Sequence, residues 1–259
     1  MKYLVLFILT VSIGFSQTIS VKYIEQKILD REKIEQIPEF AREEALKMNL
    51  YKLIYSDGNS IYKNDELNLN SDKSTSIENE ALYEDSKTIT TTIYRVTSNN
   101  NEKWYYKEYI NNLMYFNLNN ANKNWDGKDS LHDWSWQLTN ETKNISGYVC
   151  KKAISNQNGM ILTAWYSEEI PVNAGPEKFD GLPGLIFYVG TQFFKWEATD
   201  IKIETRISKI EKPIMPEKTY TLNEVFSYVG NEVSKLRSGT TTKTEGNSTS
   251  TTTTTIIRN

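Results

Sequence analysis

Apolar and polar residues alternate along most of the chain, in short runs that turn-forming residues separate. Alternation with a period of two is typical of β-strands that bury one face. The runs of β-type residues are 19–29, 51–55, 60–62, 88–96, 103–110, 113–118, 147–155, 160–167, 185–189, 193–199 and 201–210. They predict a mainly antiparallel β-sheet, in which 88–118 forms a three-stranded meander.

Dipeptide turn signals join several of these runs into hairpins. Asp57-Gly58 lies between two runs and is a strong hairpin turn signal. Asn158-Gly159 supplies the two positive-φ positions of a type I′ turn. Counting outward from a two-residue loop there places Ala153 opposite Ala164 in the predicted register.

Two stretches have helical periodicity instead. Residues 39–48 follow Pro38 and carry apolar side chains on one side and charged ones on the other. Thr221 and Glu224 match a capping box, which predicts a helix that runs to about Lys235. The expected fold class is α+β with antiparallel β predominating, arranged as a curved sheet or half-barrel with a few helices.

The N-terminus is typical of a secretory signal peptide. Met1-Lys2 is a short positive start, and an apolar stretch follows from Tyr3 to Phe15. Small residues at Gly14 and Ser16 predict cleavage before Gln17, with a buried N-terminal strand or helix as the alternative. The protein is therefore expected to be periplasmic or otherwise exported.

The C-terminal residues have a different composition. Residues 238–255 are nearly all Thr, Ser and Gly, with too little apolar area to offset the entropy of ordering. The β-propensity of threonine makes a terminal strand the alternative. The predicted organisation is a signal peptide at 1–16, a single β-rich domain at 17–237 and a disordered tail at 238–259.

Charge and hydropathy exclude two classes of partner. The 259 residues include 30 Lys and Arg against 33 Asp and Glu, a net charge of −3 that argues against binding to nucleic acid. Every apolar run is shorter than the roughly 18 residues that a membrane-spanning helix needs. Aromatic residues reach 12%, and the many Tyr and Trp fit a β-rich chain.

Cys150 is the single cysteine of the chain. One thiol cannot form an internal disulfide, so packing must stabilise the fold. A cysteine within an apolar, β-patterned run is expected to be a small buried hydrophobe. A catalytic or metal-binding role is the alternative.

Residues 122–133 are rich in Asn and Asp and place oxygen ligands at calcium-loop spacing. The pattern departs from a calcium loop because Asn122 is neutral and Asp133 is too short for the bidentate position. An Asn- and Asp-rich turn loop is the preferred interpretation. The only histidine, His132, lies close in sequence to Asp126 and Asp129, and these residues with Asp133 would be the acid–base groups of a hydrolase.

Trp125, Trp134 and Trp136 lie among Asn and Asp residues. Exposed indole faces beside amide side chains would suit a carbohydrate-binding module. Burial in the core is the preferred interpretation for Trp134 and Trp136, because two residues spaced by two share one face of a strand.

Residues 171–190 hold three of the six prolines and four of the twelve glycines. Such density fixes a specific backbone path, since Pro sets φ and Gly permits positive φ or close approach. The segment then enters an apolar strand directly. A functional loop and a structural crossover are equally compatible with this pattern.

The hexapeptide within Asp180–Ile186 resembles the motif that names the GLPGLI family of exported Bacteroidetes proteins. The ordered resemblance runs from Trp134 to Val189, and it includes Cys150-Lys151-Lys152-Ala153. It implies an envelope protein, and because no activity is established for the family, it supplies no catalytic residue. The positions that it marks as a motif segment of unknown role are Gly175, Pro176, Gly181, Leu182, Pro183, Gly184, Leu185, Ile186 and Cys150.

These features together favour a non-enzymatic envelope factor. Aromatic side chains on the concave face of a curved sheet would bind an apolar, peptide or protein ligand, such as a lipid, a peptide or an envelope protein. The alternatives are the hydrolase centred on His132 and the carbohydrate-binding module. The sequence assigns no catalytic residue, cofactor or metal ion.

Overall fold

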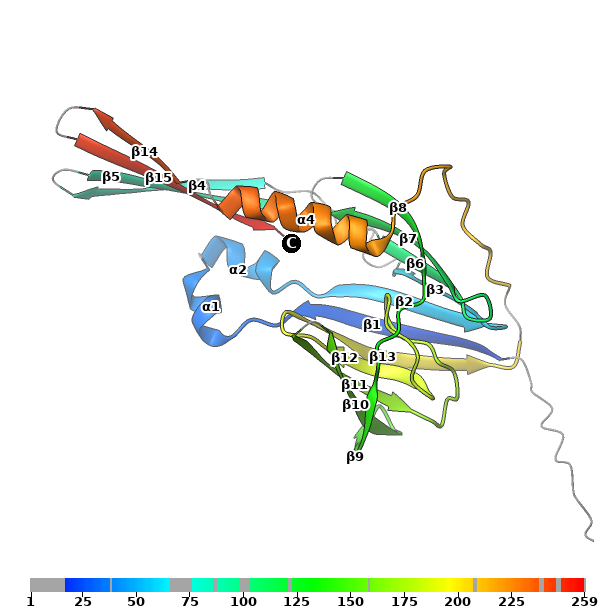
Figure 1. The fold of residues 1–259 in the computed structure, drawn as a ribbon. Helices are drawn as coiled ribbons and strands as arrows, with labels where there is room; N and C mark the ends of the chain where they lie inside the picture. The colour runs from blue at the N-terminus through cyan, green and yellow to red at the C-terminus, as the bar shows by residue number, and fades with distance from the viewer. Residues whose placement is uncertain are drawn as a thin grey trace, which may run out of the picture.

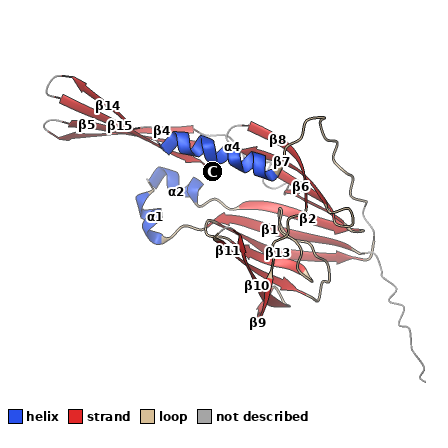
Figure 2. Ribbon diagram, in the orientation of Figure 1, coloured by secondary structure: helices blue, strands red, loops and turns tan. Residues whose placement is uncertain are grey.

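The structure is a computed structural model that describes residues 17–37, 39–65, 76–85, 88–97, 103–120, 123–157, 159–206, 209–237, 240–245 and 248–258. Its strands are β1 (Thr18–Lys27), β2 (Asn49–Ser56), β3 (Asn59–Asn64), β4 (Ser76–Asp85), β5 (Thr88–Thr97), β6 (Lys103–Glu108), β7 (Leu113–Asn120), β8 (Lys123–Ser130), β9 (Gln137–Ile145), β10 (Tyr148–Gln157), β11 (Met160–Ser167), β12 (Leu185–Gly190), β13 (Phe194–Glu204), β14 (Thr240–Glu245) and β15 (Ser248–Arg258). Its helices are α1 (Arg31–Gln36), α2 (Glu39–Ala45) and α4 (Leu222–Arg237). Figures 1 and 2 show how these elements are arranged.

Eleven of the strands form one sheet, in the order β8-β7-β6-β3-β2-β1-β13-β12-β11-β10-β9. Every neighbouring pair in it is antiparallel. The sheet is open, because its edge strands β8 and β9 do not pair with each other. The predicted α+β class, with antiparallel β predominating and few helices, is confirmed.

Strand β1 lies at the centre of this sheet and brings distant parts of the chain together. It pairs with β2 on one side and with β13 on the other. Ile19 therefore lies opposite both Tyr55 in β2 and Ile203 in β13. This level of the sheet forms the floor of a pocket that is described below.

Both dipeptide turn signals join the strands that the sequence predicted. Asp57 and Gly58 have φ values of 50° and 73° and connect β2 to β3. In the β10–β11 hairpin, Ala153 lies opposite Ala164, as counting from the turn predicted. Gly159 has a φ of 86°, and Asn158 lies outside the described residues. In turns of this type, positive φ at the central positions matches the right-handed twist of the paired strands, which explains why such dipeptides fix register so strongly.

Two strand predictions were wrong in their pairing or extent. The expected meander is divided, since β5 belongs to a separate four-stranded sheet of order β14-β15-β5-β4, whereas β6 and β7 lie in the large sheet. Residues 201–204 continue β13 and do not begin a new strand. Neighbouring runs with strand propensity do not reveal which partner each run will find, because sheet pairing is non-local.

The structure tests the prediction for the C-terminal end of the chain but not the one for the N-terminal end. The expected signal peptide, residues 1–16, lies outside the described residues. The C-terminal segment, expected to be a disordered tail, contains strands β14 and β15 instead. The β-branched side chain of threonine favours extended backbone, and β15 finds a parallel partner in β5.

The helices match the sequence pattern in their positions. The Thr221 backbone N–H donates to a Glu224 carboxylate oxygen at 2.7 Å, and the Glu224 N–H donates to the Thr221 hydroxyl at 3.3 Å, so the capping box of α4 is present. Helix α2 ends at Ala45, three residues earlier than expected. The short helix α1 was not predicted, and Asp30 caps it by accepting from the Lys33 N–H at 2.8 Å.

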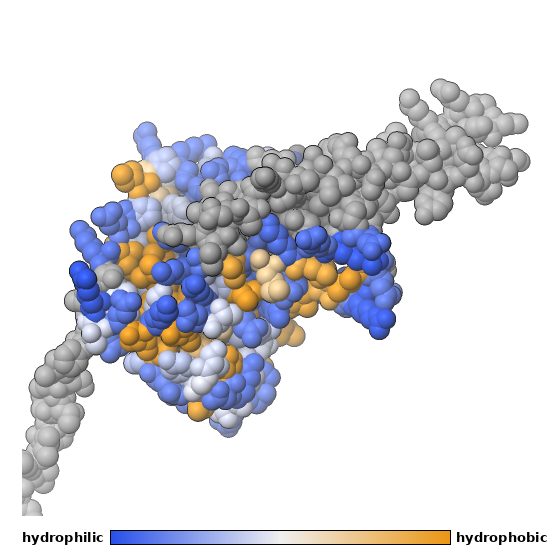
Figure 3. All heavy atoms as spheres, turned by 180° about the vertical axis from the view of Figure 1, so that it is seen from behind, coloured by the Kyte–Doolittle hydropathy of each residue, from blue (hydrophilic) through white to orange (hydrophobic). Residues whose placement is uncertain are grey.

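The core lies against one face of the large sheet, here called the inner face. Ile19, Val21 and Tyr23 of β1 are buried on it at alternate positions. Figure 3 views the opposite side of the molecule to Figure 1 and shows apolar residues in orange across the middle, with hydrophilic residues on either side. None of the helices in the described part of the chain has the length and apolar character needed to cross a bilayer.

Candidate functional site

Residues 168–184, here called the covering segment, connect β11 to β12 and lie on the inner face. The Phe179 ring is 5.1 Å from the Trp196 ring of β13, measured between centroids. On its other side Phe179 meets Trp134 at 4.7 Å. The sequence predicted a ligand on the concave face of a curved sheet or half-barrel; the sheet is instead open, and the protein's own Pro- and Gly-rich segment occupies its inner face here.

Glycines allow the covering segment to approach neighbouring backbone and side chains closely. A Cβ at Gly184 would lie 2.1 Å from the Ser167 carbonyl oxygen, and one at Gly175 would lie 2.8 Å from the end of the Ile186 side chain. Gly181 has a φ of +83°, which favours glycine for conformational reasons. The motif glycines are thus required by packing and backbone conformation.

The remaining motif residues divide into buried and exposed positions. Pro183 is exposed and lies next to the close approach at Gly184. The buried members are Pro176, Leu182, Leu185 and Ile186. The hexapeptide therefore fixes the end of the covering segment and the start of β12 in the core.

A buried ion pair ties the covering segment to β6. The Lys107 ammonium donates to the Asp180 carboxylate at 2.8 Å and to the Phe179 carbonyl oxygen at 3.0 Å. The two charged side chains are only 1% and 4% exposed. Burial lowers the pKa of Lys107 and raises that of Asp180, while each charge opposes the shift of the other.

A second buried group, here called the acid–lysine cluster, consists of Glu25, Lys103 and Glu177. The Lys103 ammonium contacts both carboxylates, one from β1 and one from the covering segment. The Trp196 indole N–H donates to Glu25 at 2.6 Å. Lys103 also lies 4.5 Å from the centre of the Tyr51 ring.

The two carboxyl groups of this cluster have opposite pKa shifts. Burial raises the pKa of Glu25 to about 7, and the neighbouring Glu177 carboxylate adds to this rise. Burial also acts to raise the pKa of Glu177, but Lys103 and Lys178 lower it to about 2. Both carboxyl groups face the same ammonium, and because their pKa values are shifted apart, Glu25 is the one that holds a proton at mildly acidic pH.

Buried tyrosines surround the cluster on the inner face. The Tyr51 and Tyr62 rings stack at 5.0 Å, and Tyr23 donates from its hydroxyl to the Ile186 carbonyl oxygen at 2.5 Å. The Tyr62 hydroxyl is buried and has no hydrogen-bond partner among the described residues. Burial raises the pKa of Tyr23 and Tyr62, so these phenols stay neutral at physiological pH.

The charged residues of this inner face were not among those predicted from the sequence. The signal for them is the strand period, because Glu25 has the same parity as the buried Val21 and Tyr23. Lys103 and Lys107 have the same parity as the buried Tyr105. A charge at an inward position of an alternating strand must find a partner, and here the covering segment supplies it.

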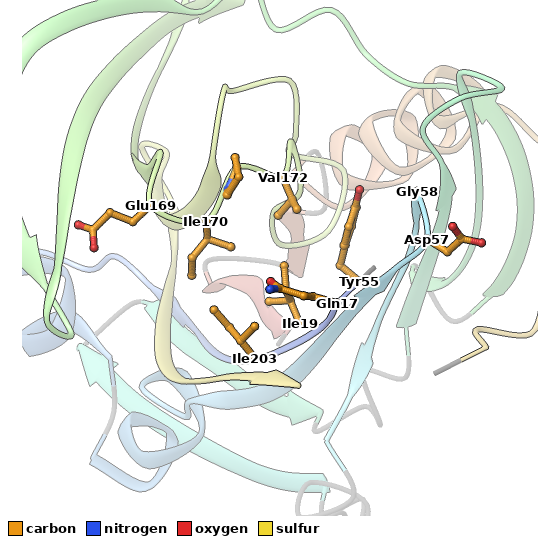
Figure 4. A pocket seen from close by; sticks show the side chains of 10 residues that line it. Gln17, Ile19, Tyr55, Asp57, Gly58, Glu169, Ile170, Val172 and Ile203 are labelled. Atoms are coloured by element: carbon orange, nitrogen blue, oxygen red, sulfur yellow. The ribbon is translucent and has the colours of Figure 1, made fainter. Parts of the chain in front are cut away.

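An open pocket lies where the covering segment begins (Figure 4). Its volume is about 330 Å³. Three adjacent strands supply Ile203, Ile19 and Tyr55 at one level of the sheet. Ile170 and Val172 of the covering segment face them, so the floor and one wall are apolar.

The rim of this pocket carries two carboxylates. Asp57 and Glu169 lie on opposite sides of it, with their carboxyl groups turned outward (Figure 4). Glu169 is held in place because it accepts a hydrogen bond from the Val149 N–H at 2.8 Å. Gln17, the residue after the predicted cleavage site, also lines the pocket. The pocket therefore joins an apolar floor to a negatively charged rim.

The structure does not bring the predicted acid–base residues together. Asp126 accepts from the Asn117 amide at 2.8 Å, and Asp129 accepts from the Leu222 N–H at 3.0 Å. Asp133 accepts from the Ser135 N–H at 2.9 Å. His132 is exposed and lies edge-on to Trp134, with 4.5 Å between ring centroids.

The interpretation of residues 122–133 as an Asn- and Asp-rich loop is also corrected. Residues 123–130 form the edge strand β8, whose extended backbone points alternate side chains to opposite faces. This spacing separates the oxygen ligands that a calcium loop would gather. No group of three or more His, Cys, Asp or Glu side chains in the described ranges could hold a metal ion.

The tryptophans and Cys150 are largely internal. Trp125 and Trp134 are 2% and 5% exposed, and Trp136 is half-buried with its indole N–H donating to the Asp180 carbonyl oxygen at 2.8 Å. Trp134 and Trp136 lie in the connection between β8 and β9, and not on a strand. Cys150 is fully buried, and burial raises the pKa of its thiol to about 11.

Comparison with known proteins links the covering segment to a family. Residues 154–188 match a family whose description is "Protein of unknown function (Porph_ging)". This range extends from β10 into β12 and contains the whole covering segment. No curated protein matches the sequence of the chain.

Solved structures share the fold of the chain. Two structures of PNGF-II, in space groups C2 and P21, match it with a TM-score of 0.50 each. They are 17% and 18% identical to the chain over 88% of its length. The chain spans only 35% of those structures, so it corresponds to about a third of their length.

Proposed function

We propose that the protein is an exported envelope protein of the GLPGLI family that acts as a non-enzymatic binding factor for a peptide segment of a partner protein. The hexapeptide and the signal-like N-terminus support the family and the export. The match over residues 154–188 agrees with a family assignment at this segment. Mature protein isolated from the periplasm should begin at Gln17.

The observation that carries the proposal is the pocket beside the start of the covering segment. Its volume of about 330 Å³ is at the low end of the range for small-molecule sites, and it suits one apolar side chain of a peptide. The outward carboxylates of Asp57 and Glu169 suit a basic residue next to that side chain. The preferred partner is therefore a segment in which a branched apolar residue precedes Lys or Arg.

The experiment is isothermal titration calorimetry of the full mature chain with three synthetic peptides. They are acetyl-Ala-Ile-Lys-Lys-Ala-amide, the same peptide with Ser in place of Ile, and the same peptide with both Lys replaced by Glu. We expect the first to bind best. Loss of the Ile side chain should weaken binding roughly tenfold or more, since its burial contributes about 1.5–3 kcal/mol.

A pair of variants locates the binding. Ile203→Glu places a third carboxylate at the apolar floor and should abolish binding of the Ile-Lys-Lys peptide. Ile214→Glu is the matched control, because Ile214 is 99% exposed and does not line the pocket. Equal binding of all three peptides, no binding of any, or equal loss in both variants would contradict the proposal.

A further inference from the structure

The covering segment connects the pocket to the acid–lysine cluster. Its first residues, Glu169–Val172, form a pocket wall, and Glu177 lies in the cluster. Backbone hydrogen bonds hold the segment as one unit: the Gly181 N–H donates to the Asn173 carbonyl oxygen at 3.3 Å, and the Ile186 N–H donates to that of Ala174 at 2.9 Å. Glu177 and the pocket wall therefore belong to one continuous, hydrogen-bonded segment.

We propose that Glu25, Lys103 and Glu177 form a proton-operated latch that holds the covering segment on the sheet and thereby sets the shape of the pocket. The effect on peptide binding rests on the proposed function. The latch itself rests only on the cluster, because it describes how this segment is attached.

The charges of the cluster explain how a proton would act. With Glu25 protonated, the Lys103 ammonium faces a single carboxylate, that of Glu177. When Glu25 ionises, two buried carboxylates face one buried ammonium. The added negative charge repels Glu177, the member of the cluster that belongs to the covering segment.

No other polar group described around Glu25 changes its charge near neutral pH in a way that would offset the ionisation of Glu25. Trp196 from β13 only donates to Glu25, and Lys178 is 3.4 Å from Glu177 on the covering segment. The remaining titratable neighbours are tyrosines whose pKa values burial raises, so they stay neutral: Tyr23 of β1, Tyr51 of β2, Tyr62 of β3 and Tyr105 of β6.

The raised pKa of Glu25 sets the direction in which pH acts on the latch. Burial raises its pKa to about 7, so the latch is closed at mildly acidic pH and loosens as the pH rises through neutrality. The Lys107–Asp180 pair attaches the next turn of the segment independently. We therefore expect local loosening and not release of the whole segment.

The test is hydrogen–deuterium exchange of the full mature chain between pH 5.5 and 8.5, corrected for the intrinsic pH dependence of exchange. Protection of the Gly181 and Ile186 amides should fall at least tenfold over this range. Glu25→Gln is isosteric with the protonated acid and keeps a donor for Glu177 and an acceptor for Lys103. It should remove this fall.

Glu141→Gln is the matched control, since Glu141 is an exposed acid paired with Lys152. It should keep the wild-type pH dependence. A flat wild-type profile, or an equal fall in Glu25→Gln, would overturn the latch. If Glu25→Gln does not fold, the fluorescence difference between wild type and Trp196→Phe should titrate with a midpoint near 7, and absence of a midpoint between pH 6 and 8 would overturn it.

Peptide titrations at pH 6 and pH 8 separate the two proposals. Affinity of the wild type for the Ile-Lys-Lys peptide should change at least threefold between them, and that of Glu25→Gln should not. Protection that depends on Glu25, without peptide binding at either pH, would contradict the proposed function and leave the latch supported. Binding whose pH dependence is equal in both proteins would contradict the latch alone.

Discussion

Gly184→Ala tests whether the motif glycines are required by close packing. The added Cβ would lie 2.1 Å from the Ser167 carbonyl oxygen, 2.5 Å from its carbonyl carbon and 2.9 Å from the Glu168 nitrogen. All three are backbone atoms, so no side-chain rotation can relieve the overlap. Ser167 is itself held, because its hydroxyl donates to the Val149 carbonyl oxygen at 2.9 Å.

The overlap must move β11 and the start of β12 apart where both are buried. Overpacking of a rigid core site costs about 1–3 kcal/mol, and the loss of strand contacts adds to this. We expect Gly184→Ala to lower the free energy of unfolding by about 3 kcal/mol. Urea denaturation followed by tryptophan fluorescence should show a lower midpoint with an unchanged slope.

Gly230→Ala provides the matched control for this substitution. Gly230 lies within α4, and a Cβ there meets nothing within 4 Å. Alanine is the better helix former by about 0.5–1 kcal/mol, so this variant should be slightly more stable than the wild type. If the free energy of unfolding of Gly184→Ala is within about 0.5 kcal/mol of the wild-type value, the close-packing explanation of the motif is refuted.

Four further outcomes follow from the inner face. Tyr62→Phe removes a buried hydroxyl without a described partner and should raise the free energy of unfolding by about 1–2 kcal/mol in urea denaturation; a loss of stability would show that the hydroxyl is satisfied. Lys107→Met leaves Asp180 buried and unpaired and should cost about 3–5 kcal/mol, measured in the same way, whereas a loss below 1 kcal/mol would count against the ion pair. At pH 8 about one in a thousand Cys150 thiols is ionised, so a thiol-specific disulfide reagent should react only as fast as the protein opens, and rapid reaction would contradict its burial. The pKa of Glu25 is raised to about 7 in the folded state, whereas in the unfolded state it is near 4.5. Stability should therefore fall by about 2.5 kcal/mol from pH 5 to pH 8 in wild type and stay flat in Glu25→Gln.

Local chemistry made part of the fold predictable from the sequence. Asn158-Gly159 fixed the register of β10 and β11, and the Thr221–Glu224 box fixed the start of α4, because each is a contact between near neighbours in the chain. The placement of β5 and β6 in different sheets could not be predicted from local sequence, since it depends on which distant strand each of them pairs with.

For the candidate site, the sequence predicted the covering segment but not the residues that hold this segment on the sheet. The Pro and Gly density identified the covering segment, but its attachment involves Glu25 and Lys103, which are distant in sequence. Their inward parity was visible in the strand pattern. Which acid would meet which lysine depends on the path of the covering segment, and that path depends on the assembled sheet.

The central claim is that the pocket beside the covering segment binds an apolar residue of a basic peptide. The most direct measurement is methyl NMR of the mature chain labelled at isoleucine, titrated with the Ile-Lys-Lys peptide. The methyl signals of Ile19, Ile170 and Ile203, which line the pocket, should shift in a saturable way, and that of Ile214 should not. Saturable shifts at other isoleucines only, or no shifts at millimolar peptide, would contradict the claim.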